Sequence, residues 1–179
     1  MLALSSILPE EGVVRDTVFE GFDITQYLRP SVDQVDEFLE NGIYLFDGEF
    51  GGILMDPNAV KLISAVRVNR EIVSYVMLCD NFEDYGQTLS ELGDSYGLIG
   101  VYTREKHRHN GYARVAMKHM ATYLSTMISK DHLGVLWSQD HIRDSFAKVF
   151  GEIAPQVIIQ EFRYLCDMKF SHPEYEIAA

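Results

Sequence analysis

The clearest periodic pattern in the chain is a stripe of apolar residues that follows Gly111. Its members recur every three or four residues, as on the buried face of an amphipathic helix. They are Ala113, Ala116, Met117, Met120, Ala121, Leu124, Met127 and Ile128. The apolar run 97–101 precedes the stripe and is short enough for a buried strand. The pattern therefore predicts a strand, a loop and a helix, in that order.

Further strands are predicted on both sides of this unit. Residues 60–68 and 71–79 are rich in β-branched residues, and Asn69-Arg70 between them indicates a tight hairpin. Less regular strand patterns occupy 13–22, 132–137 and 157–170, and the last of these has room for two strands.

Two further helices are predicted. The first begins at Ser31, which is expected to form a capping box with Gln34, and ends at Asn41-Gly42. The second covers 140–150 and would end at Gly151. Of the remaining chain, 43–55 fits either a short helix or a strand, and 81–95 has the polar, acidic composition of a surface loop.

The order of these elements predicts the fold class. Strands and helices alternate in the second half of the chain, after a hairpin in the first half. A mixed β-sheet with helices on both faces, an α/β fold, buries such a series of elements. The 179 residues, 47% of them hydrophobic, suit one domain over 1–179.

Charge and composition narrow the function classes. A formal net charge of −12 argues against nucleic-acid binding, which needs a basic face, and is compatible with either simple solubility or attraction of a cationic partner. No apolar run reaches the roughly 18 residues of a membrane-spanning helix. The N-terminus lacks the basic start of a signal peptide, so a cytoplasmic protein is expected. The histidines and cysteines show no zinc-binding spacing, so no metal is expected.

Basic residues nevertheless gather around the loop that precedes the predicted long helix. Five of the fifteen Lys and Arg residues lie there, namely Arg104, Lys106, Arg108, Arg114 and Lys118. The start of a helix directs free backbone N–H groups and the positive end of the helix dipole at one point. The sequence therefore predicts an anion site, most naturally a phosphate site, at this loop.

The segment Arg108-His109-Asn110-Gly111-Tyr112-Ala113 resembles the acyl-CoA binding signature [RQ]xxGx[GA] of the GNAT superfamily of N-acetyltransferases. The resemblance is best supported over 58–165, with 1–57 as substrate-side elements and 171–179 as a polar tail. It implies a GNAT-like fold and an acyltransferase that uses acetyl-CoA as co-substrate. The acceptor would be a primary amine, either a small molecule or a protein lysine or N-terminus.

The resemblance also implies which residues bind the cofactor. The backbone amides of the loop would hold the pyrophosphate, and the edge of the preceding strand would pair with the pantetheine arm. By position these residues are Val101, Tyr102, Thr103, Arg108, His109, Asn110, Gly111, Tyr112, Ala113 and Arg114. Arg104, Lys106, Arg114 and Lys118 could add contacts to the phosphates.

The catalytic residues are less clearly marked. Many family members have a tyrosine that protonates the departing thiolate, and this chain has Ala147 at that position. Ser145 is the nearby hydroxyl, although helical spacing suggests that it faces elsewhere. Asp94 is the first candidate for the base, with Glu91 and Tyr96 as alternatives. A catalytically degenerate binding or regulatory protein, acting on a basic partner, stays open as a second function, and a homodimer stays open as the oligomeric state.

Overall fold

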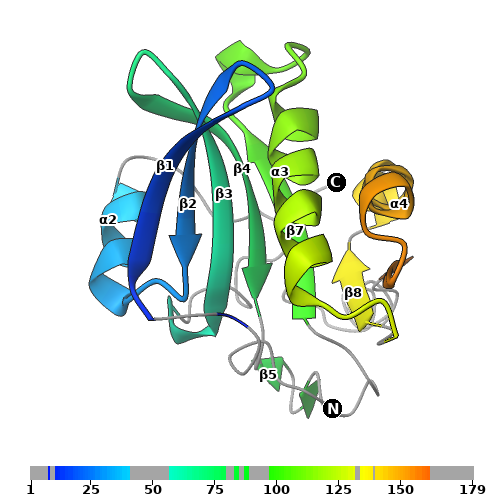
Figure 1. Cartoon of the computed structure of the whole chain (residues 1–179). Coiled ribbons are helices and arrows are strands. Elements are labelled where there is room, and N and C mark those ends of the chain that lie inside the picture. Colours follow the sequence, from blue (N-terminus) through cyan, green and yellow to red (C-terminus); the bar gives the residue numbers. More distant parts are fainter. Residues whose placement is uncertain are drawn as a thin grey trace, which may run out of the picture.

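The computed structural model describes residues 8, 11–40, 57–79, 83–84, 87–88, 97–131, 134–138 and 140–161. Their main feature is a seven-stranded sheet in the order β1-β2-β3-β4-β7-β8-β9 (Figure 1). The strands are β1 Val13–Phe19, β2 Phe22–Leu28, β3 Val60–Val68, β4 Glu71–Cys79, β7 Gly97–Thr103, β8 Gly134–Ser138 and β9 Val157–Glu161. Pairing is antiparallel from β1 to β7 and parallel from β7 to β9, so the predicted mixed sheet is confirmed.

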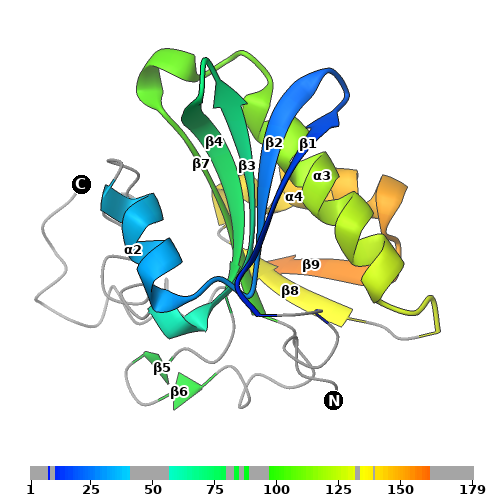
Figure 2. The same cartoon turned by 60° about the vertical axis from the view of Figure 1, so that its left-hand side comes forward.

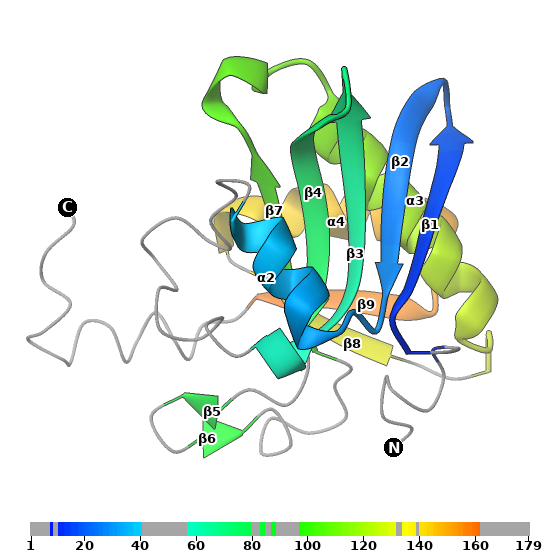
Figure 3. The same ribbon diagram turned by 90° about the vertical axis from the view of Figure 1, so that its left-hand side faces the viewer.

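Helices cover both faces of this sheet, as predicted. The long helix α3 (Tyr112–Met127) and α4 (Asp140–Ile153) lie on one face, and α2 (Val32–Glu40) lies on the other (Figures 1 and 3). Both parallel connections, β7-α3-β8 and β8-α4-β9, advance the same way along the sheet. Right-handed crossovers of that kind place their helices on a common face.

Shorter elements complete the fold. The 3-10 helices η1 and η3 span Pro57–Ala59 and Glu105–His107. A separate two-stranded ladder pairs β5 (Glu83–Asp84) with β6 (Gln87–Thr88), within the predicted surface loop. No helix in the described part of the chain is long and apolar enough to cross a membrane.

Local chemistry explains the elements that were predicted well. The turn between β3 and β4 has φ values of 51° at Asn69 and 70° at Arg70, as a two-residue primed turn requires. The capping box that starts α2 is also confirmed. The Gln34 backbone N–H donates to the Ser31 hydroxyl over 3.3 Å, and the Ser31 N–H donates to Gln34 Oε1 over 2.9 Å.

Two boundary predictions are wrong. The single strand expected over 13–22 is a hairpin of β1 and β2, which turns at Glu20 and Gly21, both with positive φ. Gly151 does not end the last helix, because α4 continues to Ile153 and stops before Pro155. The predicted helix end at Asn41-Gly42, the segment 43–55 and the chain beyond 161 lie outside the described residues.

The core lies between the sheet and the two helices on its α3 face. The apolar stripe of α3 packs there as predicted, with Ala116, Met120, Ala121 and Leu124 fully buried. Phe146 and Phe150 of α4 fill the neighbouring space. This packing fixes the start of α3 relative to α4, and a candidate site lies where these two helices face the end of β7.

Candidate functional site

The strands β7 and β8 diverge soon after they meet. They pair only at Gly97 with Leu136 and at Leu98 with Trp137, after which β8 follows β9 instead. Figures 2 and 3 show β8 and β9 running at a steep angle to β4 and β7. Among the described residues, no strand therefore pairs with this edge of β7 from Ile99 onward. An unpaired strand edge offers backbone N–H and C=O groups to an extended ligand.

The basic loop follows β7 after the short helix η3. His109 and Gly111 have φ values of 65° and 78°, and α3 begins immediately afterwards. Within the described chain, no backbone carbonyl accepts the N–H groups of 109–114, and Val115 is the first to bond back, to the Gly111 carbonyl. Alternating backbone conformations and a free helix start together form an anion-binding nest.

The loop is held in this shape by its own side chains. The Asn110 amide donates to the carbonyls of His107 and Arg108 over 3.1 and 3.2 Å. The His107 and Arg108 N–H groups donate to the carbonyls of Arg104 and Glu105. These contacts occupy carbonyl groups and leave the free N–H groups available, so the loop is preorganised for an anion.

A pocket of about 610 Å³ opens beside this loop, between the start of α3 and the middle of α4. Its lining residues are Thr103, His107, Arg108, His109, Gly111, Tyr112, Ala113, Arg114, Met117, Ser145, Lys148 and Val149. These residues include two arginines, one lysine and two histidines but no carboxylate. The chain as a whole has a net charge of −12, yet every charged residue in this lining is basic. A lining of this kind indicates an anionic ligand.

Most of the residues predicted to bind the cofactor line this pocket. They are Thr103, Arg108, His109, Gly111, Tyr112, Ala113 and Arg114. Three others do not line it. The Val101 side chain packs against the core, Tyr102 lies against Tyr75 with ring centroids 5.6 Å apart, and Asn110 braces the loop. Val101 and Tyr102 still contribute their backbone to the open edge of β7.

Helix α4 forms one wall of the pocket, and the orientation that the sequence predicted for one of its residues is wrong. Ser145 was expected to face away from the site, but Ser145, Lys148 and Val149 all line the pocket. Ala147 instead packs against the core. Positions 145, 148 and 149 share one helical face, which excludes 147. Lys148 was missed altogether, and the only available signal was its spacing of three residues from Ser145.

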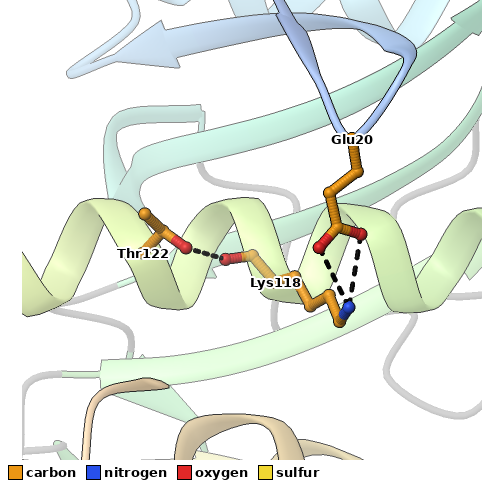
Figure 4. A network of polar contacts seen from close by, with 3 residues as sticks. All are labelled: Glu20, Lys118 and Thr122. Atoms are coloured by element: carbon orange, nitrogen blue, oxygen red, sulfur yellow. Dashed lines mark hydrogen bonds and ion pairs between the residues drawn. The ribbon is translucent and has the colours of Figure 1, made fainter. Parts of the chain in front are cut away.

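Three of the four cations expected to add phosphate contacts have other partners. Arg104 donates through Nε to the Ile72 carbonyl over 2.7 Å, and Lys106 pairs with Glu71 at 3.5 Å. Lys118 pairs with both carboxylate oxygens of Glu20, at 3.0 and 3.2 Å, while its own carbonyl accepts from Thr122 (Figure 4). Of these four, only Arg114 lines the pocket.

The Glu20–Lys118 pair belongs to a contact between the β1–β2 hairpin and α3. Phe22 meets Tyr112, the first residue of α3, edge to face with ring centroids 5.9 Å apart. Phe19 meets His119 in the same way at 5.2 Å. Burial lowers the pKa of His119, whose Nδ1 is hydrogen-bonded to the Ser64 hydroxyl at 2.9 Å. The hairpin thus steadies the start of α3, and His119 has a structural place outside the pocket lining.

The predicted base candidates fall in an undescribed part of the chain. Glu91, Asp94 and Tyr96 all lie outside the described residues, so their positions relative to the pocket stay predictions. The described residues contain no cluster of His, Cys, Asp and Glu that could hold a metal ion.

Comparisons with known proteins do not assign this site. No protein-family model matches the chain, and no curated protein and no solved structure gives a significant match.

Proposed function

We propose that the protein is a GNAT-like acyltransferase that binds acetyl-CoA in this pocket and transfers the acetyl group to a primary amine. One observation carries the proposal. The open edge of β7 ends at Thr103, in the lining of a pocket that also contains cations and the loop whose backbone N–H groups at 109–114 are accepted by no carbonyl of the described chain. An extended arm that ends in phosphates, as in acyl-CoA, matches both parts of this surface.

The dimensions and charge of the pocket support an acyl-CoA. Its volume of about 610 Å³ lies within the roughly 300–1,000 Å³ of typical ligand sites. The free N–H groups of 109–114 suit a pyrophosphate, and Arg108 and Arg114 add charge-assisted contacts. The backbone edge at Ile99–Thr103 suits the amide groups of a pantetheine arm.

The proposed reaction is a direct transfer. The neutral amine nitrogen attacks the thioester carbonyl carbon, a C–N bond forms, the C–S bond breaks, and sulfur leaves as a thiolate. The amine proton passes to a base, for which Asp94 is the first candidate and Glu91 and Tyr96 the alternatives. Backbone N–H groups at the open β7 edge, near Val101, would stabilise the oxyanion. The thiolate then takes a proton from water.

Net acidity favours a cationic acceptor. The charge of −12 would attract an amine that is protonated in solution, whether a small molecule, a lysine side chain or a protein N-terminus. A second candidate is a GNAT-like binding protein without turnover. Its support is Ala147, which packs against the core and offers no hydroxyl where the family usually has a tyrosine.

Two measurements test the proposal. Calorimetry is expected to show binding of acetyl-CoA at micromolar to millimolar concentration, and thiol release with a panel of amines and basic peptides is expected to show transfer. Absence of binding at millimolar acetyl-CoA would refute the acyl-CoA site. Binding without transfer to any acceptor would favour the binding protein over the enzyme.

Ser145 gives a sharper test of turnover. Ser145 lines the pocket, so we expect its hydroxyl to donate a hydrogen bond to the departing thiolate in place of the missing tyrosine. A hydrogen bond to a charged group contributes about 1.5–3 kcal/mol, so Ser145→Ala should lower kcat by about 10- to 100-fold. Affinity for acetyl-CoA, measured by calorimetry, should change less than about twofold because the thioester is uncharged before reaction.

Ser145→Thr is the matched control because it keeps a hydroxyl on the same helical face. We expect this variant to retain most of kcat. Equal kcat in Ser145→Ala and the unsubstituted protein would show that water alone serves the leaving sulfur.

A further inference from the structure

We infer that Lys148 of α4 contacts a phosphate of the bound acyl-CoA and makes the pocket selective for phosphorylated thioesters; this inference rests on the proposed function. Lys148 lines the pocket opposite the loop, on the same face of α4 as Ser145 and Val149. The ligand would then be held from two sides, by the start of α3 and by a helix that lies outside the hexapeptide motif.

The surroundings of Lys148 leave its charge available. Two acids lie one turn away along α4, Asp144 before Lys148 and Glu152 after it, and Asp144 lies 3.8 Å from Arg143. No carboxylate of the described residues forms an ion pair with Lys148. This contrasts with Lys106 and Lys118, which pair with Glu71 and Glu20. Of the three lysines Lys106, Lys118 and Lys148, Lys148 is thus the one that lines the pocket and forms no ion pair with a described carboxylate.

The charge of the ligand gives Lys148 a role. An acyl-CoA carries a pyrophosphate and a 3′-phosphate, and the negative charges of these two groups outnumber the two arginines of the loop side of the pocket, Arg108 and Arg114. The loop amides with Arg108 and Arg114 suit one of these groups, and Lys148 lies on the opposite wall of the same pocket. A lysine on a flexible stem acts on phosphate as a mobile point charge, so it does not require a fixed bidentate geometry.

The experiment compares Lys148→Gln with Lys148→Arg and with Lys130→Gln, a matched loss of charge at an exposed lysine beyond the end of α3. Calorimetry with acetyl-CoA at low salt should show about tenfold weaker binding for Lys148→Gln alone, and near-normal binding for Lys148→Arg. Raising the salt to about 1 M should shrink the difference, because it screens exposed charges.

A second ligand identifies the phosphate. If Lys148→Gln also weakens binding of acetyl-dephospho-CoA, Lys148 contacts the pyrophosphate, and if it does not, the contact is with the 3′-phosphate; both outcomes support the inference. Equal acetyl-CoA affinities for Lys148→Gln, Lys130→Gln and the unsubstituted protein would overturn it while leaving the proposed function intact. Failure of the unsubstituted protein to bind acetyl-CoA would overturn both.

Discussion

Gly111→Val is expected to abolish measurable binding of acetyl-CoA, a loss of at least about 100-fold in affinity, because it removes charge-assisted contacts from several loop amides at once. Gly111 caps α3 with φ 78° and ψ 2°, a conformation that a β-branched residue adopts only under strain. A Cβ there would meet no atom within 4 Å, so the expected effect comes from backbone strain and not from a collision. The backbone would relieve this strain by changing its local angles. That change would rotate the neighbouring N–H groups away from the anion position that they share. Calorimetry with acetyl-CoA measures the loss.

A control is needed because strain at a positive φ also lowers stability. Gly12 has φ 74° and lies at the start of β1, at the other end of the sheet from the loop, where a Cβ would meet only Gln34 Oε1 at an ordinary 3.7 Å. Gly12→Val should therefore lose similar thermal stability and keep its affinity for acetyl-CoA. If both variants bind equally well, the loop is not the phosphate site.

The fold was predictable where short-range chemistry decides it. The Asn69-Arg70 turn, the Ser31–Gln34 capping box and the stripe of α3 each depend on residues close together in the sequence. The strand β2 was missed because its buried positions include polar residues. Gln26 is 5% exposed and Thr25 is 2% exposed, and the Thr25 hydroxyl is hydrogen-bonded to Asp16 of β1 and Arg67 of β3. No local pattern reveals those partners.

The candidate site was likewise predictable only where it depends on residues that are close together in the sequence. Its loop was predictable because glycine, basic residues and the helix start are contiguous. Its far wall was not, since the place of Lys148 depends on how α4 packs beside α3. The same limit explains why the acidic partners of Lys118 and Lys106 were not foreseen, because Glu20 and Glu71 lie far from them in the sequence.

Gly97→Ala is expected to lower the free energy of unfolding by about 3 kcal/mol or more, beyond the ordinary range for small-to-large changes. Gly97 opens β7 with φ 153°, and an added Cβ would collide with the carbonyl of Cys79 on β4. The carbonyl belongs to the backbone of β4 and the Cβ is fixed to the backbone of β7, so no flexible side chain can move aside to relieve the contact. Gly97 also pairs with Leu136 just before β7 and β8 diverge, so relaxation there would disturb the open edge as well.

Gly151→Ala provides the opposite case within the same protein. Gly151 lies inside α4, where a Cβ meets nothing within 4 Å, so alanine should stabilise the protein by about 0.5–1 kcal/mol through helix propensity. Denaturant unfolding of both variants gives the comparison. One methyl group should thus act in opposite directions at two glycines, because one position faces a backbone carbonyl and the other faces solvent. A Gly97→Ala variant as stable as the unsubstituted protein would contradict the close approach of β4 and β7, and with it the point at which β7 begins its open edge.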